Sequence, residues 1–599
     1  MFAVAVATCL AHATPELLLR ANQQATASAG SGTLVRTYLY HSEGMDGTAA
    51  STVDLATGRY VESSQAGLSR SGDGFDGAVP WMRDLSNFYL PQEGGNKPAL
   101  AINQAYRNSN LWWRADRAGA TIKPVDCNSI EVTPRGGQPF RATFDPQTHL
   151  LASIHEQLTF GQAAEIRYSR YRRCGRALVP GRIETIADGE TSVSETYELD
   201  KCAVAAPKPR SAYAMPRIQP EDWSLPPSGR TTVAMRPNDT EVMIEASING
   251  KGPFLFYLDS GGHNIISPRL ARELGIRIEG QGQSGGAGES RVEQGYARVA
   301  SIGAGGAVLK NQTIAVLETS PPDVVGELIS GILGLEYFER FVTRIDYAAN
   351  TVTFEAPDHF SAAERRAAGT PVPFKLYEHM PQVAGRFDDE PALFDIDTGS
   401  GQTVTMTRPF VERTGLRARY LDAVTMVDGF GTGGASRSTI IRAAKLALGS
   451  EVVLRPAASL STAQYGAFSD PAYGGNLGNG ALRHFTVTFD YPHQTMYLAR
   501  VAHPDLSAYG YNRTGMVVVL DNGQLKVVDA SPGTPAAEAG IQTGDLLRSV
   551  GDVDVARQGL RETKQMLKQV PVGRPLAVTF ERAGTQHVVT LTPRDLVPE

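Results

Sequence analysis

The sequence predicts a mainly β protein of several domains, with two related β-rich lobes at its centre. The chain has 599 residues, and a typical domain size of about 150 residues suggests roughly four units. Short runs of alternating apolar and polar residues recur between Gly, Asp and Pro turns, which is the pattern of half-buried strands. In addition, the segment that begins at Gly331 is repeated at Gly475, which indicates a duplicated lobe.

Composition and net charge argue against some classes of function. Hydrophobic residues make up 42% and charged residues 20%, and the formal net charge is −6. There is no long basic run, so the sequence does not point to nucleic acid as a partner. The longest apolar stretch, "MFAVAVATCLAHATPE", is shorter than the ~20 residues that span a bilayer, so we expect no transmembrane segment.

The first residues have the character of a targeting segment. Residues 1–14 predict the remnant of a secretory signal, with Ala11-His12-Ala13 as the cleavage site. We therefore expect an exported, soluble protein in the periplasm of a Gram-negative bacterium. The alternatives are a lipid anchor at Cys9, where "VATC" is a poor match to a lipoprotein box, and a cytoplasmic protein that begins with an apolar helix.

Residues 15–205 predict a β-rich N-terminal domain, because runs such as "GTLVRTYLYHS" and "PFRATFDPQTHLLASIHEQ" alternate in strand fashion. We expect Trp81, Trp112 and Trp113 in its core, and Cys174 and Cys202 are candidates for a disulfide. The expected shape is an antiparallel half-barrel, which resembles periplasmic lipoprotein-carrier folds. Residues 206–229 are rich in proline and predict a linker.

The duplicated region contains lobe 1 (230–360) and lobe 2 (361–503). Each copy is expected to run through an apolar strand, an Asp-Ser/Thr-Gly turn, a short helix that ends at a glycine, a glycine-rich hairpin, a Leu-Gly segment and a closing hairpin. An offset of 144 aligns seven identical residues, namely Gly331, Leu333, Gly334, Phe341, Asp346, Tyr347 and Thr351 with Gly475, Leu477, Gly478, Phe485, Asp490, Tyr491 and Thr495.

The two turns, "LDSGG" at Asp259 and "IDTGS" at Asp397, suggest a pair of carboxylates. Each aspartate follows an apolar run, and the glycine after the hydroxyl residue lets the backbone turn tightly. If the lobes face each other across a pseudo-twofold axis, the carboxylates meet and share one proton. The ionised member can then activate a water molecule, while the protonated member hydrogen-bonds a carbonyl oxygen.

Together, the paired D-[ST]-G turns and the segments Ile332-Leu333-Gly334 and Asn476-Leu477-Gly478 resemble the retropepsin-type aspartic proteases, over about residues 230–500. The resemblance implies that Asp259 and Asp397 are catalytic and that Ser260 and Thr398 interlock across them. Gly261, Gly399 and Ser400 would support the dyad. By the same resemblance, two hairpins would cover the substrate, with the flap glycines Gly285, Gly286, Gly288, Gly431, Gly433 and Gly434.

Two positions depart from the family pattern. Gly262 stands where a small hydroxyl residue or Ala is usual after D-[ST]-G, and Asn476 is polar where an apolar residue is expected.

Two other residues near the turns could be taken for functional groups, but we do not favour a functional role for either. His263 is interpreted as structural or solvent-facing, because this chemistry needs no imidazole. Asp395 and Asp397 share a strand face, yet no further ligand completes a metal site, so we expect neither metal nor cofactor.

The C-terminal residues 508–597 resemble bacterial PDZ domains through "DASPGTPAAEAGIQTGDLL". Such domains add the C-terminus of a peptide as an extra strand and hold its carboxylate with backbone N–H groups. By resemblance, the peptide-binding residues are Thr514, Gly515, Met516 and Val517. The alternative is a domain that only packs on the lobes.

The favoured hypothesis is an aspartic endopeptidase whose PDZ domain recruits protein or peptide substrates. Gly262 and Asn476 favour a rival, a non-catalytic peptide-binding protein built on the same fold. A third hypothesis, lipid or lipoprotein handling by the N-terminal domain, depends on fold analogy alone.

Overall fold

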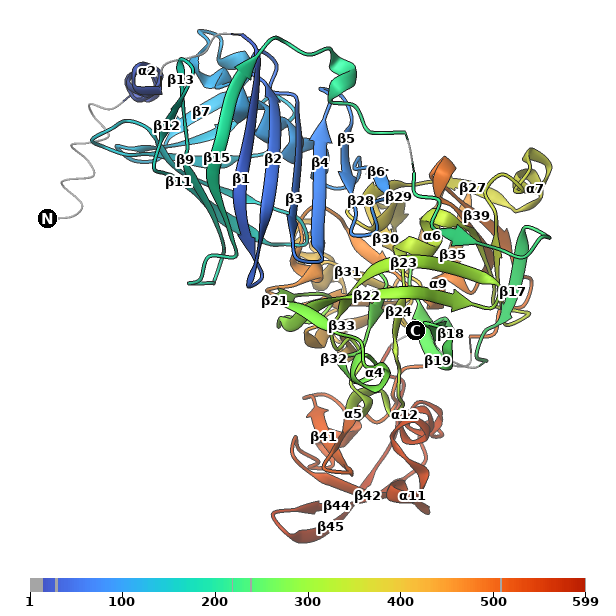
Figure 1. Ribbon diagram of the computed structural model, residues 1–599. Helices are drawn as coiled ribbons and strands as arrows, with labels where there is room; N and C mark the ends of the chain where they lie inside the picture. Colours follow the sequence, from blue (N-terminus) through green and yellow to red (C-terminus); the bar gives the residue numbers. More distant parts are fainter. Residues whose placement is uncertain (1–13, 27–30, 218, 238–239, 507–508, 598–599) are drawn as a thin grey trace, which may run out of the picture. The chain divides into compact units, whose positions relative to one another are not determined.

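A computed structural model describes residues 14–26, 31–217, 219–237, 240–506 and 509–597 (Figure 1). Except for Thr14, the predicted signal remnant lies outside these residues. The chain forms two compact units. The first comprises residues 1–221 with 279–282 and 375–378, and the second comprises the remainder. In the described ranges, no helix combines the length and apolar character needed to cross a membrane.

The N-terminal unit is built on one large antiparallel sheet, as its alternating pattern predicts. The strand order is β6-β5-β4-β3-β2-β1-β15-β14-β11-β10-β9-β8-β7. Its strands are β1 (Thr33–Ser42), β2 (Met45–Asp54), β3 (Tyr60–Ala66), β4 (Ser69–Phe75), β5 (Pro80–Arg83), β6 (Tyr89–Pro91), β7 (Thr121–Pro124), β8 (Ser129–Thr133), β9 (Phe140–Phe144), β10 (Leu151–Gln157), β11 (Ala163–Ser169), β14 (Arg182–Ala187) and β15 (Glu195–Ala205). The unit also contains α2 (Pro15–Thr26), α3 (Lys97–Asn108) and the hairpin of β12 (Arg172–Cys174) and β13 (Ala177–Val179).

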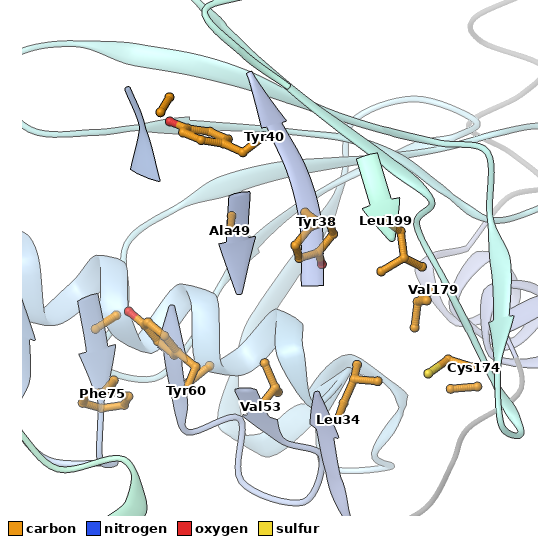
Figure 2. Packing of buried hydrophobic residues seen from close by; sticks show 14 residues of the cluster. Leu34, Tyr38, Tyr40, Ala49, Val53, Tyr60, Phe75, Cys174, Val179 and Leu199 are labelled. Atoms are coloured by element: carbon orange, nitrogen blue, oxygen red, sulfur yellow. The ribbon is translucent and has the colours of Figure 1, made fainter. Parts of the chain in front are cut away.

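Two apolar clusters fill this unit. The first joins residues of β1 to β4 to Ala101 and Ala105 of α3, and Figure 2 shows Tyr38, Tyr60 and Phe75 among its members. The second surrounds Trp112, which is 1% exposed. Burial of apolar surface is the main stabilising contribution here, at about 25 cal/mol per Å². Trp81 is also buried, Trp113 packs at the edge of the second cluster, and Cys174 and Cys202 form the predicted disulfide.

Lobe 1 contains an eight-stranded sheet in the order β16-β23-β20-β24-β19-β18-β22-β21. Its elements are β16 (Trp223–Ser224), β17 (Arg230–Ala234), β18 (Met243–Ile248), β19 (Lys251–Leu258), β20 (Ile265–Ile266), α4 (Pro268–Leu274), β21 (Ile278–Ser284), β22 (Val292–Ala304), β23 (Ala307–Val316), α5 (Pro322–Val325), β24 (Gly331–Leu333), α6 (Leu335–Arg340), β25 (Val342–Asp346) and β26 (Thr351–Glu355). As expected, α4 ends at a glycine, Gly275, which has a left-handed conformation.

Lobe 2 repeats this plan, with β30 in the place of β19 and β37 in the place of β24. Its elements are α7 (Ala362–Ala367), β27 (Thr370–Pro373), β28 (Lys375–Tyr377), β29 (Met380–Phe387), β30 (Glu390–Ile396), β31 (Val404–Met406), α8 (Arg408–Thr414), β32 (Thr425–Gly431), β33 (Gly434–Arg442), β34 (Lys445–Leu448), β35 (Glu451–Leu454), β36 (Ala457–Ser461), β37 (Gly475–Leu477), α9 (Asn479–Leu482), β38 (Phe485–Asp490) and β39 (Thr495–Arg500).

The closing hairpins of the two lobes form one shared sheet. Its order is β17-β26-β25-β38-β39-β27, so β25 of lobe 1 pairs directly with β38 of lobe 2. Thr343 lies opposite Phe489 in this antiparallel pair. The shared hydrogen bonds fix one lobe against the other, which is what a site built from both lobes requires.

The C-terminal module has a sheet in the order β40-β41-β42-β44-β45, with β43 paired to β42. Its elements are β40 (Met516–Asp521), β41 (Gln524–Ala530), α10 (Pro535–Glu538), β42 (Leu546–Val550), β43 (Val553–Asp554), α11 (Val555–Gln558), α12 (Leu560–Gln569), β44 (Leu576–Arg582) and β45 (Thr585–Leu591). Apolar residues of the sheet and of α12 form its core. Strand β40 lies at the edge of the sheet.

Candidate active site

Asp259 and Asp397 each end a buried strand, β19 or β30. The backbone N–H of Asp259 donates to Leu333 O over 2.9 Å, and that of Asp397 donates to Leu477 O over 3.0 Å. These bonds continue the parallel pairs β19–β24 and β30–β37. The repeated Leu-Gly segments therefore hold the two aspartates in equivalent places.

Ser260 and Thr398 lock the two turns together through four hydrogen bonds. The N–H of Ser260 donates to Thr398 Oγ1 (2.9 Å), and the N–H of Thr398 donates to Ser260 Oγ (3.1 Å). Each hydroxyl then donates to a carbonyl of the opposite lobe, Ser260 to Ile396 O and Thr398 to Leu258 O, both over 2.8 Å. Both side chains are fully buried, so each lobe satisfies polar groups of the other.

The carboxyl groups of Asp259 and Asp397 lie close enough to shift each other's pKa. Burial raises the pKa of Asp259 well above its ordinary value, and the charge of Asp397 raises it further. Within each turn, the N–H of Gly261 donates to Asp259 Oδ1 (2.7 Å) and that of Gly399 donates to Asp397 Oδ1 (2.9 Å). The two N–H bonds are equivalent, so the larger rise in the pKa of Asp259 is what favours Asp259 as the holder of a shared proton.

Glycine is required in both turns because the opposite carboxyl lies against the backbone. A Cβ at Gly399 would lie 2.4 Å from Cγ of Asp259, and a Cβ at Gly261 would lie 3.0 Å from Cγ of Asp397. A side chain at Gly399 would push the carboxyls apart. The two glycines thus permit the close approach of the pair.

Asn476 contacts the pair directly, although the sequence marked it only as a departure from the family. Its Nδ2 donates to Asp397 Oδ2 over 2.7 Å. Burial raises the pKa of Asp397, while the hydrogen bond from Asn476 opposes this rise. An amide N–H can only donate, so this bond favours the ionised form of Asp397.

Gly262 and Ser400 occupy equivalent positions but differ in their surroundings. A Cβ at Gly262 would lie 3.0 Å from Asp259 Oδ2 and 3.3 Å from Cγ2 of Ile332, which is tighter than ordinary packing. The Ser400 hydroxyl accepts a hydrogen bond from the N–H of Gln402 over 3.3 Å. Lobe 1 therefore has little room for the side chain that lobe 2 holds.

His263 belongs to a polar cluster beside the lobe 1 turn. Its Nδ1 lies 2.9 Å from Glu336 Oε1, while the N–H of Asn264 donates to Glu336 Oε2 over 2.6 Å. Burial opposes the charge on Glu336, but His263 and the hydrogen bonds lower its pKa. The sequence alone did not point to Glu336; its one signal was a charged residue two positions after the Leu-Gly segment of the repeat.

Asp395 lies deep in lobe 2 and bonds to an amide. Gln382 Nε2 donates to Asp395 Oδ1 over 2.7 Å, and burial raises the pKa of Asp395 well above its ordinary value. Burial favours the neutral form of Asp395, and the hydrogen bond from Gln382 opposes this effect only in part. Across the described ranges, His, Cys, Asp and Glu side chains form no group of three or more suited to a metal ion.

The predicted flap glycines lie at and beside the tips of two hairpins, β21–β22 and β32–β33. The N–H of Gly288 donates to Thr432 O (2.9 Å), and the N–H of Ser290 donates to Gly433 O (3.0 Å). A Cβ at Gly288 would lie 2.2 Å from the carbonyl carbon of Gly433, so the backbones cross in contact. The remaining four predicted positions flank this crossing, namely Gly285, Gly286, Gly431 and Gly434.

In the C-terminal module, the predicted peptide-binding residues begin β40 and the loop before it. Thr514, Gly515 and Met516 are buried, and Met516 belongs to the core of the module. Val517 is instead partly buried against an apolar cluster in which Met426 and Ile440 of lobe 2 meet Leu596 and Val597 of the module. The structure therefore places part of this stretch in contact with the lobe.

Known proteins match separate parts of the chain. An aspartyl protease family model matches residues 244–337, and a PDZ domain model matches residues 526–582. A carboxy-terminal-processing protease of Bartonella bacilliformis is 33% identical over 84 residues, and a putative serine protease HhoB of Synechocystis is 30% identical over 76 residues. These matches cover 14% and 13% of this chain, and 19% and 18% of the relatives, so the chain spans less than a fifth of their length.

Solved structures match parts of the chain at low similarity. A LolA superfamily protein of Nitrosomonas europaea is 10% identical, covering 34% of this chain and 97% of that one, with a TM-score of 0.24. A retropepsin-like aspartic protease of Rickettsia conorii is 20% identical, covering 21% and 91%, with a TM-score of 0.16. On the two family-model matches, the chain contains a region that is similar to aspartyl proteases, followed by a PDZ domain.

Proposed function

We propose that the protein is an aspartic endopeptidase that hydrolyses peptide bonds with a water molecule activated by Asp259 and Asp397. The observation that carries this proposal is the pair of half-buried carboxyls that the two equivalent strands bring together. Two such groups share a proton, so one can act as a base while the other acts as an acid.

The surroundings suggest which carboxyl has which role. Asp397 accepts the hydrogen bond of Asn476 and is the ionised member, so it takes the proton of the attacking water. Asp259 carries the shared proton and donates a hydrogen bond to the carbonyl oxygen of the scissile bond. As the tetrahedral intermediate collapses, the proton held by Asp397 passes to the leaving amine.

The linked hairpin tips support a role in enclosing a substrate. Gln402, which follows the Asp397 turn, donates from Nε2 to Asp428 O in β32 over 2.5 Å. This bond connects the lobe 2 hairpin to the turn that holds the base. Closure of such hairpins excludes water and holds the substrate in place.

The test is cleavage of a peptide library by the full chain and by Asp259→Asn and Asp397→Asn. Either substitution removes one member of the pair and is expected to lower kcat/KM by about 1,000-fold or more, by analogy with loss of a catalytic triad member. Asp346→Asn, which changes a carboxylate in the shared sheet, is the matched control. Full activity in Asp397→Asn would refute the proposal. Peptide binding without cleavage by the unmodified chain across pH 3–8 would instead establish the non-catalytic rival.

We propose further that the protein is exported and that its PDZ domain binds peptide C-termini. The sequence of residues 1–14 supports export, and the PDZ family match supports peptide binding. Fractionation of cells that express the full chain tests the first proposal, and recovery in the cytoplasm alone would contradict it.

A further inference from the structure

The edge of the PDZ sheet that faces α12 is not open in this structure, because a segment of lobe 1 lies against it. This segment, residues 321–327, contains α5 and connects β23 to β24. Both α5 and α12 contact β40, the edge strand, whose strand partner among the described residues is β41 alone. A PDZ domain binds its peptide at such an edge, between the strand and the helix.

Specific contacts hold this segment against α12. Lys564 Nζ donates to Val324 O, and a guanidinium nitrogen of Arg561 lies 4.0 Å from a carboxylate oxygen of Glu327. A Cβ at Gly326 would lie 3.0 Å from the backbone N of Arg561 and 3.2 Å from Cβ of Leu560. The segment is therefore packed against the helix without a gap.

In the loop that would bind a peptide carboxylate, the backbone N–H groups already donate hydrogen bonds to side chains of the same module. Asn512 Oδ1 accepts hydrogen bonds from the backbone N–H groups of Thr514 (3.0 Å) and Gly515 (3.2 Å). The next N–H, of Met516, donates to Thr514 Oγ1 over 3.2 Å. Side-chain oxygens of Asn512 and Thr514 thus accept from all three of these amides, in the loop that PDZ domains use to bind a peptide carboxylate.

We propose that residues 321–327 are the resident ligand of the PDZ groove, and that an external peptide C-terminus binds only by displacing them. The occluded groove and the satisfied loop are independent observations, and both lead to this conclusion. The apparent affinity for an external peptide then falls in proportion to the fraction of molecules whose groove is free.

The same contact reaches both lobes of the protease region. Val325 packs with Tyr257 and Ile332 in lobe 1, next to the strands that hold Asp259. Lys564 Nζ also lies 5.5 Å from the ring centroid of Phe430, in the lobe 2 hairpin strand β32. Displacement of the segment therefore changes contacts on both sides of the candidate active site.

The test measures binding of fluorescein-labelled decapeptides that end in Val, Leu, Ile, Ala or Phe with a free carboxylate. It uses the full chain with Asp397→Asn, so that cleavage cannot consume the probe and the result does not depend on peptidase activity. Adding Gly326→Ala should tighten binding by about ten-fold or more, because the new methyl group clashes with α12. Gly415→Ala is the control, since Gly415 also has a positive φ but an added Cβ meets nothing within 4 Å.

A second variant tests the state in which residues 321–327 cannot leave the groove. Cβ atoms at positions 326 and 561 would be 3.4 Å apart, close to the ~3.5–4.5 Å separation found in disulfides. The double substitution Gly326→Cys and Arg561→Cys should lose peptide binding when oxidised and regain it when reduced, while Gly326→Cys alone should not respond. Equal affinity before and after crosslinking would overturn the proposal. So would equal affinity of the Gly326 and Gly326→Ala proteins, or no peptide binding in any variant.

Discussion

Asn476 donates a hydrogen bond to Asp397 Oδ2 over 2.7 Å, whereas the residue at the equivalent position of lobe 1 is Ile332, which cannot donate. The two aspartates therefore have different hydrogen-bond partners, although their turns occupy equivalent positions in the internal repeat. Because of this difference, we expect the two carboxyls to control different limbs of the pH profile of activity.

Replacing Asn476 with Leu should move the acid limb of the kcat/KM profile to higher pH. The hydrogen bond from Asn476 stabilises the ionised form of Asp397, so its loss raises the pKa of this carboxyl and the base is protonated at a higher pH. A hydrogen bond to a charged group contributes about 1.5 kcal/mol or more, so kcat/KM on the acid limb should fall about ten-fold. Ile332→Val is the control in lobe 1. An unchanged acid limb with only a lower melting temperature would assign Asn476 a purely structural role.

The basic limb of the same kcat/KM profile should reflect loss of the proton from Asp259. Burial and the charge of Asp397 raise its pKa, so the acid that polarises the carbonyl stays protonated well above the ordinary range of an aspartate, about pH 4. Measuring kcat/KM from pH 3 to pH 9 checks this expectation. Loss of activity already at pH 5 would show that the Asp259 proton is not held.

Thr398→Val should destabilise the protease region by about 2–4 kcal/mol. The substitution keeps the shape of the side chain, but it leaves the buried N–H of Ser260 and the carbonyl of Leu258 without their partner. Urea unfolding followed by tryptophan fluorescence gives the change. Thr353→Val, which removes an exposed hydroxyl pair with Thr232, should cost far less. Equal losses in the two variants would contradict the role of the interlock.

Glu336→Gln should make the stability of the protease region less sensitive to acid. The folded-state pKa of Glu336 is lowered, so its contribution is present above the unfolded pKa of about 4.3 and is lost as pH falls through the folded value. The free energy of unfolding, measured from pH 6 to pH 3, should therefore have a shallower slope in the variant. Glu412→Gln removes an exposed ion pair with Arg408 and should leave the slope unchanged. The same slope in both variants would show that Glu336 titrates as in the unfolded chain.

Much of the fold followed from local sequence signals. Apolar strands, helix-ending glycines such as Gly275 and Gly415, and the internal repeat each depend on neighbouring residues, and the structure contains all of them. The positions of Asp259 and Asp397 at equivalent strand ends followed from the same repeat. The exported location remains a prediction, since its signal lies outside the described residues.

Other features could not be predicted because they depend on contacts between distant segments. Asn476 looked like a weakness in lobe 2, since its hydrogen bond becomes visible only when β37 lies beside β30. Residues 321–327 have the composition of an ordinary loop, and nothing in them indicates that a module beginning near residue 508 packs against them. His263 is interpreted from the sequence as structural or solvent-facing, and its partner Glu336 could not be named because it is distant in sequence.

A single chain that contains both lobes can break the symmetry of its own candidate active site. In an assembly of two identical subunits, any residue beside one aspartate also stands beside the other. Here Asn476 occupies the position equivalent to Ile332, and Ser400 the position equivalent to Gly262, around the interlocked turns of Ser260 and Thr398. The two halves of the candidate site are consequently not equivalent, and divergence of the repeats has given the site a polarity that a homodimer cannot have.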